Sequence, residues 1–135
     1  IYINSIEGII LIIELLKSKI HRATVTEADL NYMGSLTLDE DLIDAAGLKE
    51  FEKIQVLDIT NGSRLETYII RGKRGSGKVC INGAAAHLIH EGDLVIIVSY
   101  CQLTENESLN HKPNIVNVNN ENKVIYSSVK EGMYL

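Results

Sequence analysis

Short runs of alternating apolar and polar residues, separated by turn-forming residues, make up most of the chain. Residues 15–25 alternate loosely in this way, with Lys17, Lys19 and His21 at every second position. Period-two alternation with β-branched residues predicts a β-strand, here with one cationic face. Residues 94–100 are almost wholly aliphatic or β-branched. They predict a strand that is buried on both faces.

A β-hairpin is the clearest supersecondary signal in the sequence. Residues 53–60 and 64–71 are both rich in strand-forming residues, and Asn61 and Gly62 stand between them. Asn-Gly between two such runs is the strongest short-range hairpin signal, because both residues tolerate a positive φ. Further short strands are predicted at residues 78–81, 114–118 and 123–126.

One helix is predicted, beginning near Thr37 and ending at Gly47. Thr37 and Glu40 have the spacing of a capping box, and Asp39 favours a helix start. Residues 42–46 supply an apolar face, and Gly47 is suited to the left-handed conformation that ends a helix.

Residues 72–78, Gly-Lys-Arg-Gly-Ser-Gly-Lys, nearly spell a phosphate-binding P-loop. Val79 stands where a Ser or Thr would hold magnesium, and a short β-run follows where a P-loop needs a helix. The segment therefore predicts a flexible basic loop between two strands. The small residues 83–86 mark a place where backbones or a ligand come close together.

Composition narrows the class of protein. With 135 residues and 45% hydrophobic content, the chain can bury one core, and its six or seven short strands with one helix predict a small β-barrel. The formal net charge of −5 disfavours a nucleic-acid binder, which needs a basic face. Nothing in the sequence predicts a membrane span.

The potential metal and redox residues predict no such site. Cys80 and Cys101 lie in separate apolar runs, which predicts free thiols in a reducing cytoplasm. His87 and His90 are close in sequence, but no third ligand is near them, so no metal site is expected.

Residues 1–11 are interpreted as an unmatched extension, residues 12–126 as the single domain, and residues 127–135 as a loose tail.

The stretch Tyr32-Met33-Gly34-Ser35 lies between an extended segment and the predicted helix. Residues 27–29 before it suggest a turn, and residues 30–32 read as extended. Alone, Gly-Ser is a common turn dipeptide and predicts only a surface turn. Its significance depends on the other segments of the chain.

An ordered set of segments resembles the family of pyruvoyl-dependent aspartate 1-decarboxylases. The matching stretches are residues 19–26, 28–30, 32–35 and 44–47, then Thr60-Asn61-Gly62, Arg64, Thr67-Tyr68, residues 74–76, residues 82–86, and Gly92-Asp93 with the strand after it. Each piece is weak by itself, but their order and spacing are specific. The resemblance implies a double-psi β-barrel, assembled into a homotetramer with active sites at subunit boundaries.

The resemblance also implies that the Gly34–Ser35 bond is cleaved by the chain itself. Ser35 Oγ attacks the Gly34 carbonyl, and elimination and hydrolysis then leave a β chain of residues 1–34 and an α chain of residues 35–135 that begins with a pyruvoyl group. A Schiff base between this ketone and L-aspartate provides the electron sink that decarboxylation to β-alanine needs. β-Alanine supplies pantothenate and coenzyme A synthesis. Neither a metal nor pyridoxal phosphate is expected.

Roles for individual residues follow from the matching positions. Lys19 and Arg64 would hold the substrate carboxylates, Arg64 in a bidentate fashion. The other substrate-binding positions are Asn82, Gly83, Ala84, Ala85 and Ala86.

The remaining roles concern proton transfer and cleavage. Tyr68 would donate a proton to Cα, and Thr67 would polarise the Gly34 carbonyl during cleavage. Simple alternation places Thr67 on the opposite face of its strand from Tyr68, which conflicts with that role. His21 would hydrogen-bond near the site, and Tyr32 would shape the cleavage loop.

Two other functions fit the same residues. A non-catalytic β-barrel interaction module would keep its Gly34–Ser35 bond, and a pyruvoyl decarboxylase could act on another acid such as glutamate. The sequence also leaves open whether maturation is spontaneous or needs a helper protein.

Overall fold

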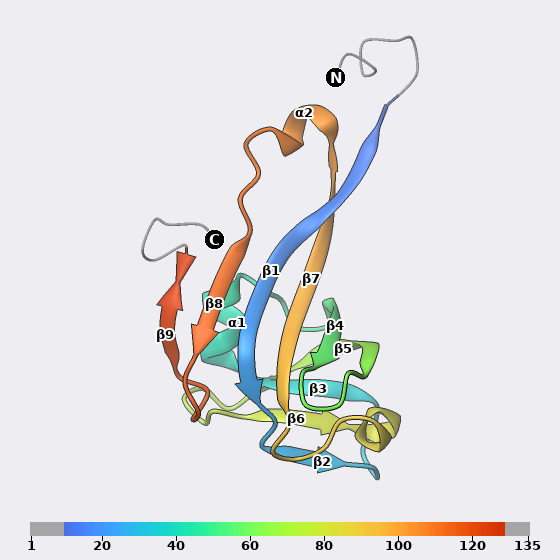
Figure 1. The fold of residues 1–135 in the computed structure, drawn as a ribbon, viewed down its shortest axis with the longest axis vertical. Helices are drawn as coiled ribbons and strands as arrows, with labels where there is room; N and C mark the ends of the chain where they lie inside the picture. Colours follow the sequence, from blue (N-terminus) through green and yellow to red (C-terminus); the bar gives the residue numbers. More distant parts are fainter. Residues whose placement is uncertain (1–9, 129–135) are drawn as a thin grey trace.

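The computed structural model describes residues 10–128 and is mainly β (Figure 1). Its strands are β1 (Ile12–Thr24), β2 (Glu27–Asp29), β3 (Ser35–Asp39), β4 (Lys53–Asp58), β5 (Arg64–Gly72), β6 (Val79–Asn82), β7 (Leu94–Thr104), β8 (Asn114–Val118) and β9 (Val124–Ser127). The helices in this part of the chain are α1 (Glu40–Ala46), α2 (Glu105–Ser108) and the 3-10 turn η2 (Gly83–His87). The prediction of a mainly β fold with one or two short α-helices is confirmed.

Strands far apart in sequence lie side by side in the sheet. The strand order is β2-β6-β3-β5-β4-β7-β1-β8-β9. Three of the pairs, β1 with β8, β2 with β6 and β3 with β5, are parallel, and the others are antiparallel. Because parallel neighbours cannot be joined by a tight turn, this arrangement depends on long-range pairing.

The core is built from aliphatic side chains that alternate along these strands. Ile20, Ile97 and Val56 occupy opposite positions on β1, β7 and β4, and each is at most 1% exposed. Each such side chain contributes about 1.5–3 kcal/mol when it leaves water. The opposite face of the same strands therefore remains available for polar side chains.

The predicted hairpin is confirmed, since β4 and β5 pair antiparallel from Leu57 with Arg64 to Lys53 with Tyr68. Its turn is tied to the turn before β7 by a buried pair of carboxyl groups, Asp58 and Asp93. Burial and the neighbouring Asp93 raise the pKa of Asp58, whereas the hydrogen bond from Asp58 lowers the pKa of Asp93.

Three local predictions around the helix are wrong. Glu27–Asp29 is strand β2 and not a turn, the residues from Leu30 to Tyr32 form a turn and not a strand, and Ser35–Asp39 is strand β3. Strand β3 lies between β5 and β6, and its Leu36 and Leu38 are fully buried. The burial of these two side chains in a strand paired with both β5 and β6 outweighs the local signal for a helix start.

Helix α1 consequently begins later than predicted. Asp39 is its N-cap and accepts a hydrogen bond from Asp41 N at 2.8 Å, so the predicted Thr37–Glu40 capping box is not formed. Gly47 ends the helix at φ 67° in the left-handed conformation, as predicted.

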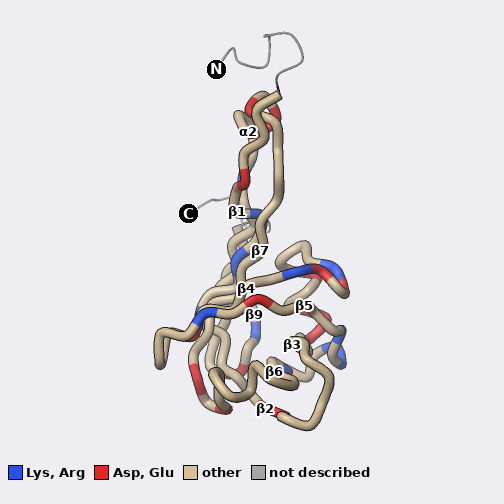
Figure 2. Tube along the Cα trace, turned by 90° about the vertical axis from the view of Figure 1, so that its right-hand side faces the viewer, with Lys and Arg blue, Asp and Glu red and all other residues tan. Residues whose placement is uncertain are grey.

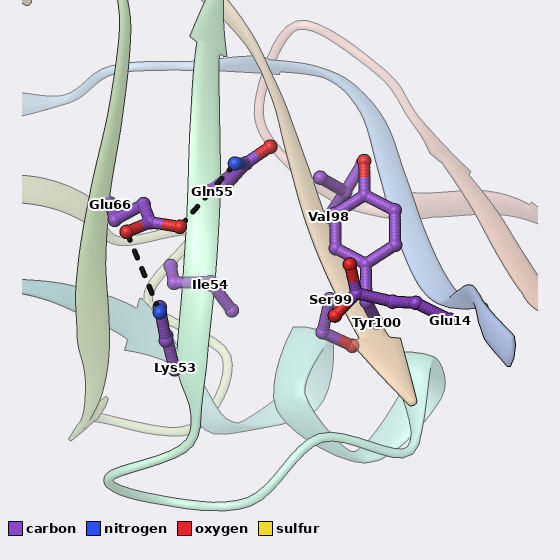
Figure 3. Close-up of a pocket in the computed structure, with 8 residues that line it drawn as sticks. All are labelled: Glu14, Lys53, Ile54, Gln55, Glu66, Val98, Ser99 and Tyr100. Atoms are coloured by element: carbon purple, nitrogen blue, oxygen red, sulfur yellow. Dashed lines mark hydrogen bonds and ion pairs between the residues drawn. The ribbon is translucent and has the colours of Figure 1, made fainter. Parts of the chain in front are cut away.

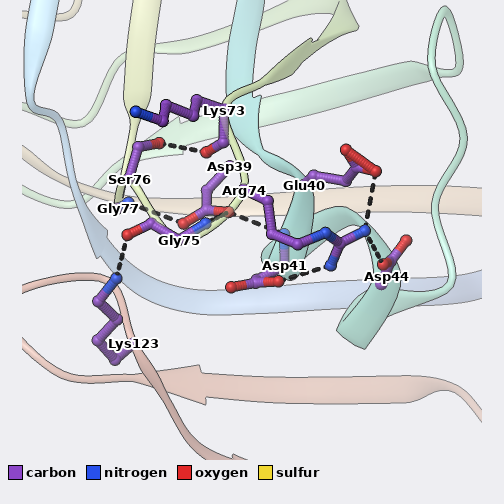
Figure 4. Close-up of polar contacts among 10 residues, drawn as sticks. All are labelled: Asp39, Glu40, Asp41, Asp44, Lys73, Arg74, Gly75, Ser76, Gly77 and Lys123. Carbon is purple, nitrogen blue, oxygen red and sulfur yellow. Dashed lines mark hydrogen bonds and ion pairs between the residues drawn. The ribbon is translucent and has the colours of Figure 1, made fainter.

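The basic loop between β5 and β6 is held firmly against α1, in contrast to the predicted flexible loop. Arg74 forms ion pairs with Glu40 at 2.8 Å, Asp41 at 2.6 Å and Asp44 at 2.7 Å (Figure 4). These three carboxylates raise the pKa of the Arg74 guanidinium. All three belong to α1, so Arg74 ties the loop to the helix.

Asp39 makes the second connection between this loop and α1. Its carboxylate accepts hydrogen bonds from Gly75 N at 3.0 Å and Gly77 N at 2.7 Å, in addition to Asp41 N (Figure 4). One buried carboxylate thus caps the helix and fixes the entry into β6.

A two-stranded arm extends from the rest of the sheet. On the N-terminal side of Ser18 in β1 and on the C-terminal side of Val98 in β7, these two strands pair only with each other among the described residues. Helix α2, with Glu105 and Glu107 in its first turn, lies at the tip of the arm (Figure 2).

The predicted extension and tail lie mostly outside the described residues. Residues 1–9 and 129–135 are not described, and Ile10 and Leu11 are exposed. Ser127 belongs to β9, and Ser128 Oγ accepts a hydrogen bond from Ile115 N at 2.8 Å.

Replacing the carboxylate of Asp39 should destabilise the protein more than replacing Arg74. Asp39→Ala removes a helix cap and leaves the buried Gly77 N–H without an acceptor, so we expect a loss of about 2–4 kcal/mol in the free energy of unfolding. Arg74→Ala removes exposed ion pairs, and its effect should be smaller. Urea unfolding at one protein concentration measures both. Equal losses would contradict this account of the loop.

Candidate active site

Ser35 is the first residue of β3, and its side chain is held from two sides. The residue is 1% exposed. Its Oγ donates a hydrogen bond to the Met33 carbonyl at 3.3 Å and accepts one from Asn82 Nδ2 at 2.9 Å. Asn82 lies directly opposite Ser35 in the antiparallel pair of β3 and β6. The hydroxyl of Ser35 is therefore oriented before any chemistry takes place.

A cavity of about 420 Å³ lies beside this pair. It is lined by Gly34, Leu65, Glu66, Thr67, Tyr68, Asn82, Ala84, Ala85 and Leu88. Six of these residues are predicted site residues, namely Gly34, Thr67, Tyr68, Asn82, Ala84 and Ala85. The volume is within the range of small-molecule sites. The fold thus gathers the loop before Ser35, β5, β6 and η2 around one space.

Thr67 and Tyr68 both line this cavity, although they are consecutive residues of β5. The pairing of β5 with β4 ends at Tyr68, and its pairing with β3 begins at Ile69. The cavity borders the strand at this change of partner. The role of Thr67 in cleavage stays a prediction.

Gly83 explains why small residues follow Asn82. Its φ is +72°, and a Cβ atom there would lie 2.7 Å from Gly34 Cα and 3.0 Å from the Tyr32 carbonyl oxygen. The backbone of η2 thus contacts the cleavage loop directly. Gly34 itself has open space around it and no positive φ, so the uncleaved chain does not require glycine at that position for steric reasons.

The predicted substrate cations lie apart from this cavity. Lys19 and His21 are on β1, which β4 and β7 separate from β5 in the strand order, and Arg64 begins β5. None of the three lines the cavity, although Leu65 next to Arg64 does. Among residues 10–128, neither Lys19 nor Arg64 forms a hydrogen bond or an ion pair. Lys17, by contrast, is bound to Glu52 at 2.8 Å.

His21 is a partly buried base close to two cations. Burial, followed by the charges of Lys19 and Arg22, lowers the pKa of the His21 imidazole. Its Nδ1 atom is buried and has no hydrogen-bond partner among the described residues. The expected hydrogen bond of His21 near the site stays a prediction.

Tyr32 lies in the turn before Ser35 and is 54% exposed, and its carbonyl oxygen faces Gly83. The backbone of Tyr32, in the loop before Ser35, therefore lies against Gly83. Ala86 is buried in the core cluster.

A second cavity of about 420 Å³ lies on the sheet face between β4, β5 and β7 (Figure 3). Its charged lining consists of Glu14, Glu66 and Lys53, and Lys53 is already paired with Glu66 at 3.5 Å. Two carboxylates against one engaged ammonium group disfavour an acidic ligand. This cavity contains no predicted site residue.

Residues 10–128 hold no group of three or more His, Cys, Asp or Glu side chains arranged to bind a metal ion. None of the helices described there is long and apolar enough to cross a bilayer. Cys80 and Cys101 are both free thiols.

Comparison with known proteins gives one consistent family. The model of the aspartate decarboxylase family matches residues 11–125. Proteins named aspartate 1-decarboxylase from Caldicellulosiruptor bescii and Bacillus subtilis are 61% and 56% identical to this chain. The alignments cover 88% of this chain and 93% of the first relative, and 82% of this chain and 87% of the second.

Among solved structures, a computationally designed protein aligns at TM-score 0.39 and 17% identity, over 63% of this chain and 96% of its own. That likeness is too low to bear on the fold.

The contact between Gly83 and the cleavage loop can be measured against a matched glycine. Gly83→Ala should lower the free energy of unfolding by at least about 1 kcal/mol more than Gly62→Ala, because added bulk in a packed contact forces the loop to move. Gly62 has φ +81° with open space around it, so its replacement reports the left-handed backbone alone. Both changes are made in a Ser35→Ala chain to keep residues 34 and 35 joined. Equal losses would show that the loop does not rest on η2.

Proposed function

The chain belongs to the aspartate decarboxylase family, and on this premise we propose that it converts L-aspartate to β-alanine and carbon dioxide with a pyruvoyl group made from its own Ser35. The β-alanine supplies pantothenate and coenzyme A synthesis. The double-psi β-barrel is the fold of the family. The observation that carries the proposal is the placement of a buried Ser35 hydroxyl between Met33 O and Asn82 Nδ2 at a cavity of suitable size.

The residues around Ser35 fit the formation of a pyruvoyl group. In self-cleavage, Ser35 Oγ forms a bond to the Gly34 carbonyl carbon while the Gly34–Ser35 C–N bond breaks, and the amine that is released takes a proton. The Met33 carbonyl accepts the hydrogen of Oγ beforehand, and Asn82 holds the oxygen in place. Thr67, which lines the same cavity, would polarise the Gly34 carbonyl. Elimination of the resulting ester and hydrolysis with loss of ammonia complete the process.

When present, the pyruvoyl group supplies a ketone that condenses with the amine of the substrate and accepts the electron pair released with carbon dioxide. The chain itself provides binding and a proton. Tyr68 lines the cavity and is 37% exposed, so its phenol can deliver a proton to a substrate there. Asn82, Ala84 and Ala85 form the wall against which the substrate rests.

The position of the cations supports a site shared between two copies of the chain. The two carboxylates of aspartate need positive partners, and Lys19 and Arg64 have no other partner among residues 10–128. Lys19 does not line the cavity beside Ser35 in its own chain. A second copy, in a homotetramer, would bring its Lys19 to the cavity.

Exposed apolar surface also supports assembly. The arm formed by β1 and β7 exposes Ile12, Tyr100 and the nearby Leu109 at 52%, 43% and 74%. Two strands alone are only marginally stable in water, so a partner that covers them would stabilise the arm. The proposal places this assembly in the cytoplasm, where free thiols remain reduced. A helper protein for maturation belongs to the same hypothesis.

Two rival functions make different predictions. An unprocessed interaction module would keep one intact mass after prolonged incubation. A decarboxylase for another acid would turn over glutamate as fast as aspartate in steady-state assays, and equal rates would defeat the assignment of aspartate.

Self-cleavage is tested by denaturing mass spectrometry. We expect two fragments that divide between Gly34 and Ser35, the larger one lighter than a serine-initiated fragment by the mass of ammonia. Ser35→Ala should remain a single chain without decarboxylase activity, because no hydroxyl can attack the carbonyl. Ser63→Ala, in the hairpin turn, is the matched control and should cleave normally. Cleavage of the Ser35→Ala chain at the same bond would rule out this chemistry.

The shared site is tested by complementation between two inactive variants. Lys19→Ala chains keep a reactive residue 35, and Ser35→Ala chains keep the cation. If each site takes residue 35 from one copy and Lys19 from another, random mixed oligomers should regain activity at about a quarter of their sites. Ser35→Ala mixed with Asn82→Ala is the control, since both residues lie on one chain in direct contact. If the first pair recovers no more activity than the control, the site is built within one chain.

A further inference from the structure

Four polar side chains share one face of the antiparallel pair of β3 and β6. Ser35 lies opposite Asn82, and Thr37 lies opposite Cys80. The residues between them, Leu36 and Ile81, are fully buried on the core face. Strand alternation therefore directs Ser35, Thr37, Cys80 and Asn82 to the other side of the sheet, where they meet.

The amide of Asn82 is fully engaged in this group. Its Nδ2 donates to Ser35 Oγ at 2.9 Å and to Thr37 Oγ1 at 2.9 Å, which uses both N–H bonds. Its Oδ1 accepts a hydrogen bond from the thiol of Cys80, with Sγ and Oδ1 3.1 Å apart. Neither Thr37 nor Cys80 has a part in the function proposed above.

The thiol of Cys80 determines which way the amide points. If the amide were turned over, Oδ1 would face Ser35 Oγ, whose proton is already donated to the Met33 carbonyl, so only the Thr37 hydroxyl could donate to it. The turned amide would also direct an N–H at sulfur, which is a weak acceptor. Burial, with the nearby Glu27 carboxylate, raises the pKa of the Cys80 thiol to about 11. The thiol therefore stays neutral at physiological pH and remains a donor.

Packing alone does not hold the amide. Thr37, Cys80 and Asn82 all line a further cavity of about 290 Å³, while Asn82 also borders the cavity that contains Gly34. The oxygen and NH2 ends of an amide have nearly the same shape, so the packing around Asn82, which is 3% exposed, does not choose between the two orientations. Its hydrogen bonds are what keep it in one orientation.

We propose that Cys80 is a positioning residue for self-cleavage: its thiol locks the Asn82 amide so that Nδ2 points at Ser35 Oγ. The inference rests on the proposed function, because the cleavage of the Gly34–Ser35 bond is the event that Cys80 accelerates. Cys80 touches neither Ser35 nor the bond that breaks, and it acts only through Asn82. A donor at residue 80 is what matters, so a serine hydroxyl can replace the thiol.

The test compares variants at residue 80 that differ in size and in donor ability. Freshly purified precursor is incubated, and cleavage is followed by denaturing mass spectrometry, with the urea midpoint of each variant measured alongside. Cys80→Val fills the space without a donor and should cleave about tenfold more slowly, as expected for the loss of one orienting hydrogen bond. Cys80→Ser should cleave close to the wild-type rate. Cys101→Ala, at the other free thiol, is the control and should be unchanged.

The outcomes separate this inference from the function on which it rests. If wild-type protein never cleaves, neither in the cell nor after purification, the proposed function fails, and the inference with it. If wild type cleaves and Cys80→Val is as fast, only the inference is overturned. If Cys80→Ser is as slow as Cys80→Val, residue 80 acts through packing and the inference is again overturned. Cys80→Ala, which leaves space instead of filling it, gives the same comparison should the valine chain fold poorly.

Discussion

The pairing of β3 with β6 is the constraint on which the candidate site depends. It places Ser35 opposite Asn82 in the register of the two strands, and a shift of β3 by one residue would turn Ser35 toward the core and Leu36 away from it. The same pairing buries Leu36 beside Ile81 and brings η2 against the cleavage loop at Gly83. Hydrophobic burial on one face thus positions reactive polar groups on the other.

Polar contacts at the far end of β3 and β6 hold that register. Asp39 ends β3, caps α1 and accepts two amide hydrogens from the loop that enters β6, while Arg74 ties the loop to three carboxylates of the helix. The glycine- and lysine-rich loop resembles a phosphate site in sequence, yet its amides are occupied by a carboxylate of the same chain. Its glycines serve this tight connection to Asp39.

The separation of Ser35 from the cations gives the protein two distinct surfaces. Lys19 and Arg64 lie on strands whose other face forms the core, and they have no partner among residues 10–128. The cavity beside Ser35, by contrast, is bordered by Tyr68 and small apolar residues, with Glu66 as its one acidic group. An acidic substrate needs both surfaces, and a homotetramer with a shared site would join them.

The sequence by itself determined the features that depend on neighbouring residues: the Asn61-Gly62 hairpin, the end of α1 at Gly47, strand β8, and the ordered motifs around Ser35 that identify the family. Only the tertiary structure decided that Ser35–Asp39 is a strand and that Thr67 and Tyr68 share one cavity. It also decided that Lys17 forms an ion pair with Glu52 and that Cys80 contacts Asn82. The physical reason is range. Turn and cap preferences act over a few residues, whereas strand pairing and burial join residues more than forty positions apart and outweigh local preference where the two disagree.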